Sequence, residues 1–178
     1  SAASDVYKRQ MYTSTTGNNN VAVGISTLYN NTEGHGNVAI GCVALGANTT
    51  GDYNVGIGYR ALDANTTADS NVAIGNQALS ANTTGANNVA VGCGALTLTT
   101  TTNDNTGIGF DALTVNTGSN NTALGSKAFR GNQTSNDGVA VGHCTLFTNT
   151  TGAANTGVGA FALKLNTTGC LLYTSDAA

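Results

Sequence analysis

Aliphatic residues and glycines return along this chain every 17 residues, and they do so nine times. Each unit follows the pattern N-[V/T]-[A/G]-[V/I/L]-G-x-x-[A/T]-[L/F]-x-x-N-T-T-G-x-x, whose places we number 1 to 17 from the first Asn. Only the step from Asn105 to Asn121 is 16 residues long. A fixed short period indicates that each unit is one supersecondary element stacked on its copies. The units begin at Asn20, Asn37, Asn54, Asn71, Asn88, Asn105, Asn121, Gly138 and Asn155.

The unit at residues 71–87 illustrates the expected course of one coil. Residues 72–75 (VAIG) alternate β-branched and small residues, which predicts a short strand. We expect a polar turn at residues 76–77, a second short extended piece at 78–79, and a closing turn at 82–85. The unit has no 3.6-residue apolar stripe, so a helix is disfavoured. The sequence therefore predicts an all-β fold, a parallel β-solenoid of about nine 17-residue coils.

Two columns of the stack are apolar in every unit, and we predict that they form a continuous core. Position 4 is always aliphatic, and position 9 is Leu in eight units and Phe in one. The position 4 column is Val23, Ile40, Ile57, Ile74, Val91, Ile108, Leu124, Val141 and Val158. The position 9 column is Leu28, Leu45, Leu62, Leu79, Leu96, Leu113, Phe129, Leu146 and Leu163.

The other face of the strand is small. Position 3 is only Ala or Gly, and position 5 is Gly in all nine units, which indicates either a positive φ or a close approach of other backbone. A strand with two apolar faces is expected to be buried on both, whereas one coil has a single interior. We therefore expect the Ala/Gly face to contact another chain, and replacement of Gly75 by valine to disrupt that assembly.

Position 12 is Asn in eight of nine units, with Thr99 as the exception. Stacked Asn side chains can form a hydrogen-bonded amide ladder along the axis. The predicted ladder consists of Asn31, Asn48, Asn65, Asn82, Asn116, Asn132, Asn149 and Asn166. The 16-residue unit loses its residue near Gly118, away from the core columns, so we expect a shortened turn there.

The low content of charged residues is consistent with a solenoid and disfavours some classes of binding partner. Charged residues make up 8% of the chain, and the formal net charge is only −3, so neither nucleic acid nor an anionic membrane is an expected partner. Disorder is the alternative for a chain rich in Gly, Asn and Thr, but the fixed apolar columns argue against it. No apolar run approaches 18 residues and no signal peptide is visible, so we expect any export signal or anchor to lie outside this segment.

The two ends share nothing with the repeat. Residues 1–10 (SAASDVYKRQ) and 170–178 (CLLYTSDAA) are similar to translated sequencing-adapter sequence, and we interpret both as non-native additions. Genuine capping segments are the alternative. The predicted repeat domain is thus 11–169, a fragment of a longer array.

Candidate chemistry is sparse. Three G-x-G-x-x-A matches, such as Gly56/Gly58/Ala61, lack room for the helix of a dinucleotide site. Cys42 and Cys93 share a column but lie three coils apart, roughly 14 Å, too far for a disulfide. His35 and His143 are far apart, and the acids are scattered over turns. We predict no catalytic residues, no metal site and no cofactor, hence no enzyme. The N-x-T triplets are turn residues in this interpretation, with N-glycosylation as the alternative.

The strand N-V-A-I-G, at residues 37–41 and 71–75, resembles the S-V-A-I-G strand of YadA-like head repeats in trimeric autotransporter adhesins. The longer unit, with A-L and N-T-T-G, is similar to repeat regions of bacterial surface fibres and phage tail fibres. The resemblance covers residues 20–169 and implies a left-handed parallel β-roll, three chains side by side, and a role in adhesion or in carrying a receptor-binding tip. The 17-residue period and the N-T-T-G turn depart from the head pattern.

The function expected from the resemblance and the columns is a non-catalytic, homotrimeric fibre segment at a cell surface or on a virion. Its partners would be copies of itself and a host-surface protein or glycan, with no membrane contact by this segment. The alternative is a monomeric solenoid that binds an ordered surface such as ice or a crystalline polysaccharide. That alternative depends on the Thr column at position 13, which includes Thr32, Thr49, Thr66 and Thr83.

Overall fold

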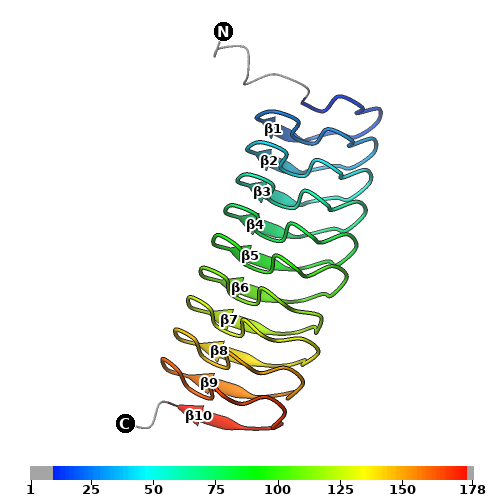
Figure 1. Ribbon diagram of the computed structural model, residues 1–178. Helices are drawn as coiled ribbons and strands as arrows, with labels where there is room; N and C mark the ends of the chain where they lie inside the picture. The colour runs from blue at the N-terminus through cyan, green and yellow to red at the C-terminus, as the bar shows by residue number, and fades with distance from the viewer. Residues whose placement is uncertain (1–9, 176–178) are drawn as a thin grey trace.

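The computed structural model describes residues 10–175, and over that range it is a parallel β-solenoid of about nine turns with no helix (Figure 1). Each coil contributes one three-residue strand to a single sheet, whose strand order is the order of the chain. The strands are β1 (Val21–Val23), β2 (Val38–Ile40), β3 (Val55–Ile57), β4 (Val72–Ile74), β5 (Val89–Val91), β6 (Thr106–Ile108), β7 (Thr122–Leu124), β8 (Val139–Val141), β9 (Thr156–Val158) and β10 (Tyr173–Ser175).

Neighbouring strands pair in parallel and in register, so each position of the repeat forms a straight column along the axis. Val38 pairs with Val55 and Val55 with Val72, and the same register holds across the short unit, where Thr106 pairs with Thr122. The missing residue is absorbed in the turn, as predicted. In the short unit the Asn116 amide donates to the carbonyl of Gly118, two residues later. In a 17-residue unit the equivalent Asn48 amide donates to the carbonyl of Gly51, three residues later.

The core lies between the inward face of the strands and the position 9 column. Leu45, Leu62 and the other buried Leu side chains of this column, with Phe129, are completely inaccessible to solvent, and Leu163 packs against them partly buried. This part of the predicted core is confirmed. The position 3 alanines from Ala39 onward are also completely buried, whereas Ala22 in the first coil is half-buried, and this column faces the leucines across the coil.

The prediction that position 4 forms the core is wrong. Its side chains point outward from the sheet, with Ile40 37% and Leu124 47% exposed. The exposed members are Val23, Ile40, Ile74, Ile108, Leu124 and Val158, while Ile57, Val91 and Val141 are half-buried. The interior is too narrow for them: a Cβ built on inward-facing Gly56 would already lie 3.3 Å from Cγ of Leu45. Position 3 is therefore small because it faces the leucines, and the inference that this face meets another chain is also wrong.

The second extended piece predicted at residues 78–79 is a turn. Leu79 has φ of 52°, and Gln77, two residues earlier, has φ of 54°. The same pair of left-handed residues recurs in other coils, for example at Lys127 and Phe129. A left-handed leucine is uncommon, and here burial of the side chain in the core column holds it in place.

The solenoid continues past the predicted domain boundary at residue 169. β10 pairs with β9, and the backbone N–H of Leu172 donates to Oδ1 of Asn155 at 2.8 Å. Backbone pairing in a parallel sheet needs no particular side chain, so a segment without the repeat motif can extend the stack. At the other end Met11 takes the position 9 place one coil before Leu28 and packs against the core. Residues 1–9 and 176–178 of the predicted non-native ends lie outside the described residues.

Candidate functional surfaces

The predicted amide ladder at position 12 is present, in three runs. Asn48 donates to Oδ1 of Asn31 at 2.8 Å, Asn65 to Asn48 at 2.9 Å, and Asn82 to Asn65 at 3.0 Å. Separate pairs join Asn132 to Asn116 and Asn166 to Asn149, both at 2.7 Å. The amides are completely buried except that of Asn166, so the ladder satisfies polar groups inside the coil while holding the closing turn.

The ladder breaks at Thr99, and the break leaves a buried polar atom without a partner. Oδ1 of Asn82 is buried and accepts no hydrogen bond, because the hydroxyl of Thr99 turns away and donates to the carbonyl of Asn116 at 3.3 Å. An unsatisfied buried acceptor costs about 1–3 kcal/mol.

Replacement of Thr99 by asparagine is therefore expected to raise the free energy of unfolding by about 1–3 kcal/mol, because the new amide would donate to Asn82. Urea denaturation of T99N measures the gain. The matched control is T101N, which places the same side chain at an exposed turn position two residues away. No gain of T99N over T101N would contradict this account of the break.

A second ladder, at position 1, was missed by the sequence analysis, which used these residues only to mark the units. Oδ1 of Asn37 accepts from the backbone N–H of Asn54 at 2.9 Å, and the Asn37 amide donates to the carbonyl of Gly51 at 2.8 Å. Asn in eight of nine units is the same signal that revealed position 12. One side chain thus joins two coils and both ends of its own coil.

A third ladder runs along the turn at position 16. The backbone N–H of His35 donates to Asp52 at 2.6 Å, and that of Asp52 donates to Asp69 at 2.7 Å. Asn103, Ser119 and Asn136 continue the pattern further along the stack. Because chemically different acceptors serve the same purpose, this column carries no recognisable motif in the sequence.

The Thr column at position 13 is bound within the stack. The hydroxyl of Thr32 donates to the carbonyl of Thr49 at 3.1 Å, and the hydroxyl of Thr49 donates to the carbonyl of Thr66 at 3.0 Å. The same bond recurs at Thr66, Thr83 and Thr150. These hydroxyls act as links between coils, so they are not free donors for an external ligand.

The outer face of the sheet is open to a partner along the whole stack. Positions 2 and 4 alternate with the buried position 3, so both point outward from every strand. Position 2 is Val or Thr from β1 to β9, and position 4 is aliphatic throughout. We name these two outward columns the strand face. At about 4.8 Å per coil the strand face is roughly 40 Å long.

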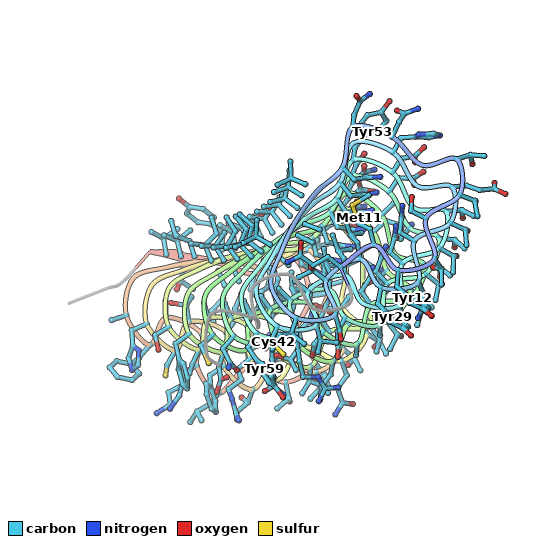
Figure 2. All side chains as sticks on the ribbon, turned by 90° about the horizontal axis from the view of Figure 1, so that it is seen from above. Met11, Tyr12, Tyr29, Cys42, Tyr53 and Tyr59 are labelled. Atoms are coloured by element: carbon cyan, nitrogen blue, oxygen red, sulfur yellow. The ribbon has the colours of Figure 1, made fainter. Side chains whose placement is uncertain are left out.

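The two turn regions lie at opposite ends of the coil cross-section (Figure 2). Seen along the axis, Cys42 and Tyr59 at position 6 lie on one side and Tyr53 at position 17 on the other, with Met11 between them. Tyr12 and Tyr29 stack face to face on the outside, with ring centroids 5.3 Å apart. Between Tyr29 and Asp63 the surface has a shallow depression, where Gly46 contributes no side chain to the column.

Potential metal ligands do not gather in one place within residues 10–175. No group of three or more His, Cys, Asp or Glu side chains is placed to hold a metal ion there. All four cysteines are free, and Cys144 Sγ lies 3.3 Å from Nε2 of adjacent His143. Arg60 donates to Asp63 at 2.6 Å, and this hydrogen bond and charge raise the pKa of the arginine.

Within the described range, no helix is long and apolar enough to cross a membrane. Comparisons with protein families, with curated proteins and with solved structures found no match to this chain.

Proposed function

We propose that the chain is a non-catalytic segment of a surface-displayed or virion-attached fibre, assembled as a homotrimer of left-handed β-rolls. The resemblance to YadA-like head repeats suggested this assembly, and one observation supports it most. The strand face consists of exposed and half-buried side chains, most of them aliphatic, with no covering element among residues 10–175.

The size of the strand face favours a partner along its whole length. A strip roughly 40 Å long and about 10 Å wide covers several hundred Å², as large as the largest apolar patch of a typical monomer. Columns of Val and Ile in a straight parallel stack are self-complementary in shape. In a homo-oligomer each chain presents the same columns, so equivalent coils can meet at equal heights along the axis.

The orientation of the strand changes which residues would make the interface. The columns at positions 2 and 4 point outward, so they replace the Ala and Gly column as the surface between chains. The position 5 glycines contact their own neighbouring coils: the backbone N–H of Gly92 donates to the carbonyl of Ile74 at 2.8 Å.

The lysine variant I74K is expected to convert the assembly to a monomer. Ile74 is 38% exposed on β4, and a lysine there keeps its charge in water on the free chain, whereas burial between chains would cost several kcal/mol. Light scattering measures the mass of the wild type and the variant. The control is S80K, on the turn of the same coil. A monomeric wild type, or an I74K protein that keeps the oligomeric mass, would refute assembly through this face.

The alternative function, a monomer bound to ice or to a crystalline polysaccharide, has lost its original basis. The Thr hydroxyls that suggested it donate to carbonyls of the next coil. A monomeric mass together with thermal hysteresis would nevertheless support this function over the fibre.

A further inference from the structure

Charge is divided between the two turn regions of the solenoid. All four Lys and Arg residues in the described range lie at positions 7 and 10, on the turn that follows the strand. They are Arg60, Lys127, Arg130 and Lys164. Five of the seven described acids lie at positions 14 to 17, on the opposite turn, namely Glu33, Asp52, Asp69, Asp104 and Asp137.

The two acids on the basic turn are neutralised by arginines. Asp63 pairs with Arg60 at 2.6 Å, and Asp111 lies 3.5 Å from Arg130. Lys127 and Lys164 have no acidic partner among the described residues. The positive charge that remains is therefore concentrated towards the C-terminal coils.

Each of these C-terminal cations lies over an aromatic ring. Nζ of Lys127 is 5.9 Å from the ring centroid of Phe110, and Nζ of Lys164 is 5.0 Å from that of Phe161. The Arg130 guanidinium is 5.9 Å from the centroid of Phe147. We name these six residues the aromatic–cation ridge. Phe110 is 49% and Phe161 52% exposed, so these two rings lie outside the core.

We propose that the aromatic–cation ridge binds a linear acidic polysaccharide, one that carries carboxylate or sulfate groups. The apolar faces of sugar rings can pack on the exposed phenylalanines, and the anionic groups can pair with Lys127 and Lys164, which have no acidic partner among the described residues. Lys127 and Lys164 lie two coils apart, roughly 10 Å along the axis. That separation is comparable to the length of a disaccharide, the unit at which charge repeats in many uronate polymers.

A polysaccharide fits the ridge better than a nucleic acid does. Affinity for nucleic acid depends on neutralising many closely spaced phosphates, whereas the ridge offers only three cations on a chain of net charge −3. The acidic turn on the other side would repel a polyanion that wrapped around the solenoid. A glycan with sparse charge needs contact with the ridge alone.

This inference deepens the adhesive role proposed above, and it uses a different surface. The ridge lies on a turn, so a trimer that buries the strand face would present three ridges. Loss of the trimer and loss of glycan binding are thus separate results, one measured as mass and the other as affinity.

The test compares three immobilised polymers, hyaluronan, chondroitin sulfate and uncharged dextran, by biolayer interferometry at 50 and 200 mM salt. The wild type is expected to bind hyaluronan or chondroitin sulfate and not dextran, with affinity falling about tenfold over this salt range for the two lysines that have no acidic partner. The triple variant K127Q/R130Q/K164Q is expected to lose at least that factor at low salt. F110A/F161A is expected to weaken binding while keeping the salt dependence.

The matched control is R60Q, which removes a cation from the same turn outside the ridge, and light scattering confirms the same oligomeric mass for every variant. Wild-type protein that binds neither acidic polymer overturns the proposal, as does a triple variant with undiminished affinity. Equal binding to dextran, or tighter binding to a DNA oligonucleotide than to either glycan, also overturns it.

Discussion

The variant G75V is expected to lose the folded solenoid, with a fall of roughly 2–6 kcal/mol in the free energy of unfolding. Gly75 has φ of 135°, a backbone conformation that residues other than glycine rarely adopt. A Cβ there would lie 2.6 Å from the carbonyl oxygen of Gly92 and 3.1 Å from the backbone nitrogen of Cys93. These are backbone atoms of the next coil, held by the hydrogen bond from Gly92 to Ile74, so they cannot move aside.

Circular dichroism and urea denaturation measure this loss. The sequence alone predicted only a loss of assembly for the same substitution; the structure places the damage inside a single chain. G94N is the matched control, because Gly94 also has a positive φ of 72° but its added Cβ would meet side chains alone, the carboxylate of Asp111 at 2.5 Å and Oγ1 of Thr97 at 3.6 Å. We expect G94N to cost less than about 1 kcal/mol. Folded, monomeric G75V would contradict the contact between coils.

The variant G138N, which restores the asparagine that other units have at position 1, is expected to keep the stability of the fold only when Phe129 is also replaced by leucine. Gly138 replaces the Asn of position 1, and Phe129 replaces the Leu of position 9, each the only exception in its column. A Cβ on Gly138 would collide with Cε2 and Cζ of Phe129, so the ring occupies the room of the missing side chain. The two exceptions are one packing solution.

A double-mutant cycle measures this dependence. G138N alone is expected to cost about 2–4 kcal/mol by overpacking, and F129L alone about 1–3 kcal/mol by leaving a cavity. In F129L/G138N the amide can rejoin the position 1 ladder, so the double variant should cost about 2–3 kcal/mol less than the sum of the two single variants, and that difference is the coupling energy. The distant pair F129L/S80A serves as control and should be additive within about 0.5 kcal/mol. Additivity of the F129L and G138N effects would contradict shared packing.

Periodicity was sufficient to predict the coil, the parallel stack and the buried leucines, because each depends on residues that recur at one spacing. It could not decide which face of the strand was inside. Alternation along residues 72–74 shows only that Val72 and Ile74 share a face. The inward face is decided by how much room the Leu79 column leaves, a distance between two parts of the coil that no single segment encodes.

The candidate surfaces also differ in whether the sequence alone could predict them. The Asn ladder at position 12 was predictable because its geometry requires one residue type in every coil. In the ladder at position 16, Asp52, Asn103 and Ser119 accept equivalent hydrogen bonds, so no single residue type recurs at this position to indicate the ladder in the sequence. The aromatic–cation ridge occupies only the C-terminal coils, and its residues alternate between positions 6, 7 and 10. It becomes visible only when neighbouring coils are stacked.

The backbone hydrogen bonds between strands run parallel to the long axis of the stack, which has a mechanical consequence. A pull on the two ends would load successive coil interfaces in series, so the weakest interface would open first and the others would hold. Each coil that opened would release 17 residues, about 55–60 Å of extended chain. Under tension along the axis the rod would therefore lengthen in steps, one coil at a time. A force across the axis would instead act on the hydrogen bonds of many coils at once.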